Sequence, residues 1–110
     1  MRGGNQVSFL HNLAPDAISR VSFIKARGRI SEFVAQLECL IDDEWHVIVR
    51  YDTAHGFAHR DILLPDGTQE KTELSVSDFN EALTFAQLDL KTNWRTYRAR
   101  YERWLRNDGQ

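Results

Sequence analysis

Two histidines, two aspartates and two arginines lie within one short segment, residues 50–61. They are Arg50, Asp52, His55, His59, Arg60 and Asp61. Histidine transfers protons near neutral pH, aspartate can orient an imidazole, and the arginine fork matches two phosphate oxygens. Metal-independent RNA cleavage, in which the 2′-hydroxyl attacks its own phosphate, needs these groups. The segment therefore predicts an acid–base site.

In this scheme His55 and His59 carry the protons. One aspartate of the segment orients one of them, and one arginine stabilises the phosphate. A structural interpretation stays open beside the catalytic one. The segment can equally be a hairpin loop held by charge pairs, such as Arg50 with Asp61.

A metal site is the weaker interpretation of the same residues. His55 and His59 are four residues apart, a spacing that suits two ligands on one helix face, with Asp52 as a third. Gly56 lies between the histidines, and the flanking patterns are typical of strands, so a helix is not expected here. No cluster of Cys or Glu stands nearby, and no Gly-rich phosphate loop occurs. We therefore expect no metal ion and no cofactor.

The elements that must position these residues are strands, because apolar and polar residues alternate on both sides of the segment. The expected strands are 21–26, 31–41, 45–52, 59–64 and 68–74. Alternate side chains of a strand share a face, so Arg50 lies with Asp52, and His59 with Asp61. If the two strands pair, these side chains can converge.

After these strands the apolar period changes to 3.6, which predicts a helix from Ser77 to Arg106. Its apolar stripe comprises Phe79, Leu83, Ala86, Leu90, Trp94, Tyr97, Tyr101 and Trp104. Ser75 or Ser77 is the expected N-cap. A continuous helix of this length would measure roughly 45 Å, so either its end projects or it breaks near residues 91–93.

Phe85 and Leu88 lie outside that stripe. We expect them to be covered, either by residues 7–14 or by a partner subunit.

The fold class that satisfies this pattern is α+β: an antiparallel meander of about four to five strands with one long C-terminal helix packed on it. Residues 1–16 are expected to form an N-terminal arm, and residues 17–110 a single domain.

Charge is unevenly distributed along the 110 residues. Residues 91–110 carry a net charge of +4, whereas the chain as a whole carries −2. A basic end favours an anionic partner such as RNA, although a solvated helix face would look the same. The single cysteine, Cys39, and the lack of any long apolar run favour the cytoplasm, with no membrane contact.

The runs Arg50-Tyr51-Asp52, His55-Gly56 and His59-Arg60-Asp61 together resemble a motif of small bacterial proteins. Those proteins are distantly similar to the TumE-like toxins of toxin–antitoxin modules. The resemblance covers roughly residues 31–66, and this chain differs from the toxins at Phe57-Ala58. It implies a toxin-like fold, action on RNA and a neutralising, antitoxin-like partner protein.

The alternative function is a non-catalytic protein-interaction module. Phe85 and Leu88 would then form the contact of a homodimer.

Overall fold

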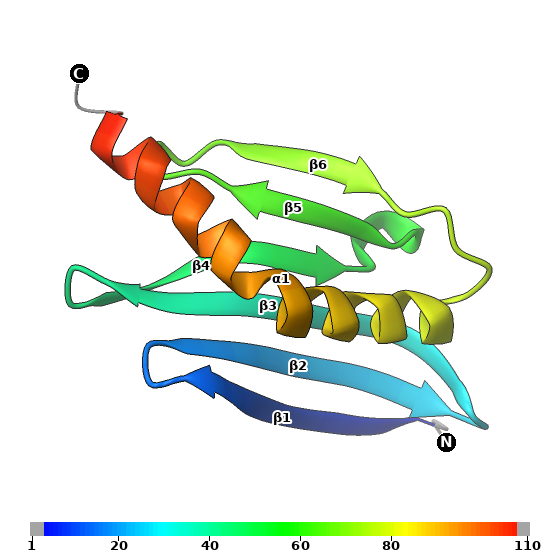
Figure 1. Ribbon diagram of the computed structural model, residues 1–110. Coiled ribbons are helices and arrows are strands. Elements are labelled where there is room, and N and C mark those ends of the chain that lie inside the picture. Colours follow the sequence, from blue (N-terminus) through cyan, green and yellow to red (C-terminus); the bar gives the residue numbers. More distant parts are fainter. Residues whose placement is uncertain (1–3, 108–110) are drawn as a thin grey trace.

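Six strands form one antiparallel sheet in the order of the chain, and one long helix lies across it (Figure 1). The computed structural model describes residues 4–107; the first three and last three residues of the expected arm and domain lie outside this range. The strands are β1 (Asn5–Ala14), β2 (Ala17–Ala26), β3 (Arg29–Ile41), β4 (Glu44–Asp52), β5 (His59–Leu63) and β6 (Gln69–Glu73). A one-turn 3₁₀ helix, η1 (Ala54–Gly56), joins β4 to β5, and α1 (Phe79–Asn107) ends the described chain. The predicted fold class is confirmed.

Tight turns set the register of the meander. Between β3 and β4, Asp42 and Asp43 both adopt positive φ, at 53° and 67°. Two consecutive residues of this kind match the twist of antiparallel strands, and aspartate tolerates the left-handed region better than most residues. Arg27 and Gly28 form the corresponding turn between β2 and β3.

The N-terminal arm expected at residues 1–16 is replaced, over Asn5–Ala14, by an edge strand paired with β2 along its length. Val7, Phe9, His11 and Leu13 share one face of this strand, and Ser8 and Asn12 share the other with Leu10 as an apolar exception. Most of β1 is nevertheless exposed, because it pairs on one edge and lies beyond the cover of the helix. The sheet therefore has six strands, one more than the upper expectation.

The helix is continuous, so the break considered near residues 91–93 does not occur. Its N-cap is Asp78 rather than Ser75 or Ser77: the Glu81 backbone N–H donates to Asp78 Oδ1 at 2.8 Å. Ser77 instead donates to the Glu81 side chain.

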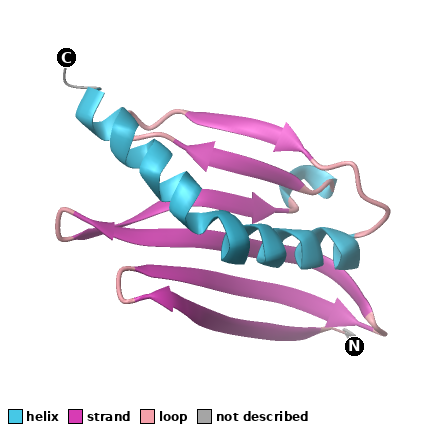
Figure 2. Ribbon diagram, in the orientation of Figure 1, coloured by secondary structure: helices cyan, strands magenta, loops and turns pink. Residues whose placement is uncertain are grey.

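The helix packs on one face of the sheet, mainly against β3, with β2 and β4 beside it (Figure 2). We call this the helix face, and the opposite side the open face. The core lies between α1 and the helix face; its largest side chains include Leu37, Tyr51, Leu90 and Trp94. The expected stripe forms this contact as far as Tyr101, whereas Trp104 is 39% exposed.

Two arginines of the basic end fasten the helix to the sheet. Arg98 pairs with Asp16 at 2.8 Å and donates to the Leu40 carbonyl, which joins the helix to the β1–β2 turn and to the end of β3. Arg100 pairs with Glu70 of β6 at 2.7 Å. Part of the positive charge near the C-terminus therefore serves packing.

The expected cover of Phe85 and Leu88 by residues 7–14 is wrong. Their exposed fractions are 47% and 62%. Residues 7–14 belong to β1 and lie in the sheet. Three of them, His11, Asn12 and Leu13, border a hollow together with Leu88 but leave it mostly exposed. Cover by a partner subunit stays a prediction.

No helix among residues 4–107 is long and apolar enough to cross a membrane.

Candidate functional site

Strand pairing divides the residues of segment 50–61 between the two faces. Tyr51 pairs with Arg60, and both side chains reach α1. Since neighbouring residues of a strand point to opposite faces, Arg50, Asp52, His59 and Asp61 lie on the open face. In the register, Arg50 lies opposite Asp61 and Asp52 lies opposite His59.

Three of these side chains form a compact group, Asp52, His59 and Asp61, which we call the polar cluster. Nε2 of His59 lies 2.9 Å from Oδ1 of Asp52 and 3.5 Å from Oδ2 of Asp61. Each of the three residues offers one possible metal-ligand atom, and these atoms all lie within 4.8 Å of one another. The convergence expected from the strand pattern therefore occurs for these three residues.

Lys71 of β6 offsets one of the two negative charges of the cluster. Its Nζ lies 3.0 Å from the Oδ1 of Asp61, the oxygen that does not face His59. Lys71 stands opposite Asp61 in the β5–β6 register, and its side chain is 43% exposed. The carboxylate of Asp61 thus bridges an imidazole and an ammonium group.

His59 is 1% exposed even though no helix covers its face. The ring of Phe57 lies 5.6 Å from its own ring, centroid to centroid. Its Nδ1 has no hydrogen-bond partner among the described residues. The polar contacts of this buried imidazole are therefore concentrated at Nε2, which faces both carboxylates.

Asp52 connects the cluster to solvent. It is fixed by the Ala54 backbone N–H, which donates to its Oδ1 at 3.1 Å. The same residue lines a shallow hollow of about 380 Å³, together with Ser31, Glu32, Phe33, Val34, Thr53 and Ala54. A ligand would reach the cluster from this side.

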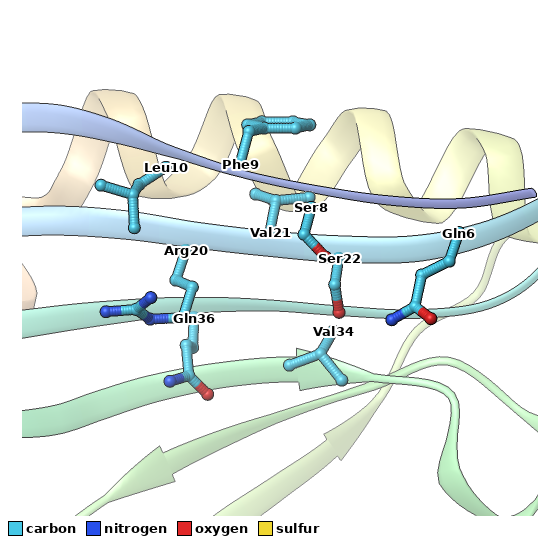
Figure 3. Close-up of a pocket in the computed structure, with 9 residues that line it drawn as sticks. All are labelled: Gln6, Ser8, Phe9, Leu10, Arg20, Val21, Ser22, Val34 and Gln36. Atoms are coloured by element: carbon cyan, nitrogen blue, oxygen red, sulfur yellow. The ribbon is translucent and has the colours of Figure 1, made fainter.

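A row of polar side chains continues from the cluster across the open face. Arg50 Nε donates to Gln36 Oε1 at 3.1 Å, and Gln36 donates to Glu38 at 2.7 Å. Glu38 also accepts from Arg20 Nε at 2.7 Å, and this hydrogen bond lowers the pKa of Glu38. The row ends in a hollow of about 520 Å³ over β1–β3, where Arg20 and Gln36 lie side by side (Figure 3).

Arg60 is not part of the polar cluster, which corrects its expected role as phosphate ligand there. On the helix face its Nη1 donates to the Tyr97 hydroxyl at 3.2 Å. The hydroxyls of Tyr97 and Tyr51 both donate to Asp89 Oδ2, at 2.6 and 2.5 Å. Burial and the hydrogen bond to Asp89 raise the pKa of Tyr51 well above its usual range. This helix-face network holds α1 against β4 and β5.

His55 also lies outside the cluster. It sits in η1 at the loop, exposed, with a left-handed φ of 71°. Among residues 4–107, the ion-pair partners of His59 are Asp52 and Asp61, and no hydrogen bond joins His55 to it. The expected pair of proton carriers is therefore not assembled, and Arg50 with Asp61 is a register pair whose side chains bond to other partners.

Cys39 is fully buried in β3, as its apolar register predicts. Burial raises its pKa to about 11, so the thiol is protonated at neutral pH and is not a nucleophile.

Sequence reasoning missed Lys71, although a signal for it exists. The Pro65-Asp66-Gly67 turn predicts that β5 and β6 fold back around residue 66, and residues equally distant from that centre then face each other. Asp61 and Lys71 are both five residues away from it.

The polar cluster offers two carboxylates, an imidazole and an adjacent ammonium group. This set can orient a proton, stabilise a phosphate through its cations, or ligate a divalent cation. Carboxylate and imidazole are common ligands of first-row metals, so Asp52, His59 and Asp61 are the residues that could hold one.

No curated protein and no solved structure matches the chain. A family model does, over residues 1–107, and it is described as a domain of unknown function, DUF7718. Since the match spans the sheet and the helix alike, this chain belongs to the DUF7718 family.

Proposed function

We propose that this chain is a toxin-like enzyme that cleaves RNA, and that the polar cluster is its reaction centre. The observation that carries the proposal is His59, buried between two carboxylates on the face that the helix leaves uncovered. Well-packed apolar residues usually stabilise such a place at least as well as a buried ionic group does. Buried, coupled charges beside a hollow are instead common at active sites.

Two cationic groups beside the cluster favour a phosphate substrate. Lys71 contacts Asp61 directly, and Arg50 stands opposite Asp61 in the register. Both side chains are long enough to reach phosphate oxygens, Lys71 by releasing Asp61 and Arg50 by releasing Gln36. Arginine can bind two such oxygens at once. A substrate phosphate bound over Asp61 would be repelled by the carboxylate, and the positive charges of Lys71 and Arg50 would offset this repulsion.

The reaction is an internal transfer at phosphorus. The 2′-oxygen forms a bond to the adjacent phosphorus, the bond from phosphorus to the 5′-oxygen breaks, and the 2′-hydroxyl proton is matched by a proton gained at the 5′-oxygen. The products are a 2′,3′-cyclic phosphate and a 5′-hydroxyl. His59 is the expected proton carrier. A metal ion held by Asp52, His59 and Asp61 would instead supply the base for this step.

The test uses the purified chain and a single-stranded RNA oligonucleotide, beside the same oligonucleotide with 2′-deoxy sugars. RNA is expected to be cut with cyclic phosphate ends, and the deoxy form is expected to stay intact. Lys71→Gln should lower the rate by roughly 10²-fold, because one cation at the phosphate is lost. Lys25→Gln, at an exposed position near the end of β2, is the matched control and should leave the rate unchanged.

Cleavage of the deoxy oligonucleotide, or equal rates for Lys71→Gln and Lys25→Gln, would contradict the proposal. Toxicity on expression in bacteria, relieved by Lys71→Gln and by a co-expressed antitoxin-like partner, is the expected cellular counterpart.

A second candidate is a non-catalytic interaction module that forms a homodimer. It is favoured by Phe85 and Leu88, two large apolar side chains of α1 that stay 47% and 62% exposed, although the ring of Phe85 lies 6.2 Å from that of Tyr51. Light scattering should then show a dimer that Leu88→Glu converts to a monomer. A wild-type monomer at all concentrations up to about 100 μM would remove this candidate, because the free energy of association would then be less favourable than about −5.5 kcal/mol.

A further inference from the structure

We propose that Asp52, His59 and Asp61 bind one divalent first-row transition-metal ion, of which Mn²⁺ and Zn²⁺ suit the ligand set best. The expectation of no metal was based on His55 and His59 at a helical spacing. The structure instead joins His59 to two aspartates through strand pairing.

The two distances from His59 to the carboxylates match those between ligands of one ion, and the three ligand atoms all lie within 4.8 Å of one another. Neighbouring ligands at about 2.1 Å from a metal are separated by about 3.0 Å in octahedral and about 3.4 Å in tetrahedral geometry. The Nε2 of His59 lies 2.9 Å from one carboxylate oxygen and 3.5 Å from the other. Small shifts of these side chains would therefore bring all three onto one ion.

The charge of the cluster also favours a cation. Two carboxylates lie close together, with side-chain exposures of 17% for Asp52 and 7% for Asp61, and the ammonium of Lys71 contacts one oxygen of Asp61. One buried negative charge is left, to be offset by a proton on His59 or by a metal ion. A divalent ion satisfies both carboxylates and the imidazole nitrogen together.

The ligand types indicate which ions fit. One imidazole nitrogen with two carboxylate oxygens suits manganese and zinc, whereas Mg²⁺ and Ca²⁺ prefer oxygen alone. Around the ligands, the Ala54 N–H holds Asp52 and Lys71 holds Asp61. Such contacts orient ligands and raise metal affinity. Three protein ligands leave coordination positions for water or a phosphate oxygen on the side of the hollow at Asp52.

Only the catalytic role of this ion rests on the proposed function, in which a bound ion would supply the base for the 2′-hydroxyl. Metal binding itself is independent of any reaction, so the two can fail separately.

The binding experiment titrates chelator-treated, intact protein with MnCl₂, followed by the paramagnetic signal of free Mn²⁺, and with ZnCl₂, followed by calorimetry. One ion per chain is expected. Asp52→Asn should weaken binding by more than about 10-fold. Its amide oxygen can still accept the Ala54 N–H, so the fold should be preserved. Asp61→Asn with Asp52→Asn should abolish binding. Asp43→Asn, at an exposed turn where asparagine tolerates the left-handed φ, is the matched control.

Absence of binding to the wild type, or equal binding by the double variant, would overturn the metal site. RNA cleavage that persists in EDTA by a chain that binds no ion would remove the metal and leave the proposed function standing. One bound ion without cleavage would do the reverse.

Discussion

The two faces of the β4–β5 strand pair carry polar groups of different construction. On the helix face, Tyr51, Tyr97 and Arg60 converge on or near Asp89, and α1 closes the group off. On the open face, Asp52 and His59 meet at the border of a hollow. A group enclosed between two elements mainly fixes their positions, whereas a buried charged group next to solvent is available to a ligand. The dense polar run in the sequence is thus two separate groups, interleaved by the alternation of strands.

The largest expected effect lies on the helix face. Trp94→Ala should destabilise the fold by roughly 3–5 kcal/mol, because the side chain is 7% exposed and its removal leaves a cavity under α1. Trp104→Ala, at 39% exposure on the same helix, is the control and should lose less than about half as much. Urea denaturation of both variants measures the difference. A loss below roughly 1 kcal/mol for Trp94→Ala would mean that the helix is not docked as described.

On the open face, His59→Ala should destabilise by about 2–4 kcal/mol. The substitution leaves two carboxylates facing each other with one ammonium partner, and it creates a cavity. His55→Asn, at the exposed left-handed position, should change stability by less than about 0.5 kcal/mol. Thermal or urea unfolding compares the two histidines directly. Equal effects would show that burial does not distinguish them, and activity loss in His59→Ala cannot be interpreted without this measurement.

Tyr51→Phe tests the helix-face network without making a cavity. At neutral pH it should lose about 1–2 kcal/mol, because Asp89 loses one hydroxyl donor. Burial and Asp89 raise the pKa of Tyr51, so the folded chain keeps a proton that the unfolded chain releases near pH 10. Its stabilising contribution is therefore complete below about pH 10 and is lost as the pH rises further.

Denaturation curves at pH 7 and between pH 10 and 11 check both parts. The decline of stability with pH should be shallower in Tyr51→Phe than in the wild type. Tyr101→Phe is the control, since burial alone raises the pKa of Tyr101. A neutral-pH loss as large in Tyr101→Phe would mean that the Asp89 hydrogen bond contributes little.

Apart from the control variants, the smallest change in stability is expected for Arg50→Gln, because Arg50 lies half exposed on the polar open face. It removes one hydrogen bond to Gln36 and should change stability by less than about 1 kcal/mol. If unfolding experiments give more than twice this value, the polar row across the open face is structural. If they agree, Arg50→Gln is a folded variant suited to cleavage assays.

The sequence predicted the parts of the fold that depend on local period. β3, β4 and α1 follow from alternation and from the 3.6-residue stripe. β1 was missed because an edge strand needs no continuous apolar face, and its exposed residues look like those of an arm.

For the site, alternation correctly placed His59 and Asp61 on one face, and the same rule excludes Arg60, which lies between them. His55 was included through closeness in sequence, but η1 directs it to solvent. Lys71 depends on the β5–β6 register, which is a property of pairing between strands rather than of any short segment. Burial of His59 could not be derived from its neighbours in sequence, since the ring of Phe57 contributes to its surroundings on a face without a helix.

The order of the elements, with α1 after all six strands, has a consequence for synthesis on the ribosome. Every strand pairs with its neighbour in sequence, so the meander can assemble as it emerges. Its apolar face must wait for the helix, whose contacts reach far back: Asn80 accepts from the Ile30 N–H, and Arg98 pairs with Asp16. Until α1 has left the exit tunnel, the nascent sheet presents an uncovered apolar surface to chaperones and to other nascent chains. Completion of the fold therefore waits for α1, the last of the described elements to emerge, even though the hydrogen bonds of the sheet can form earlier.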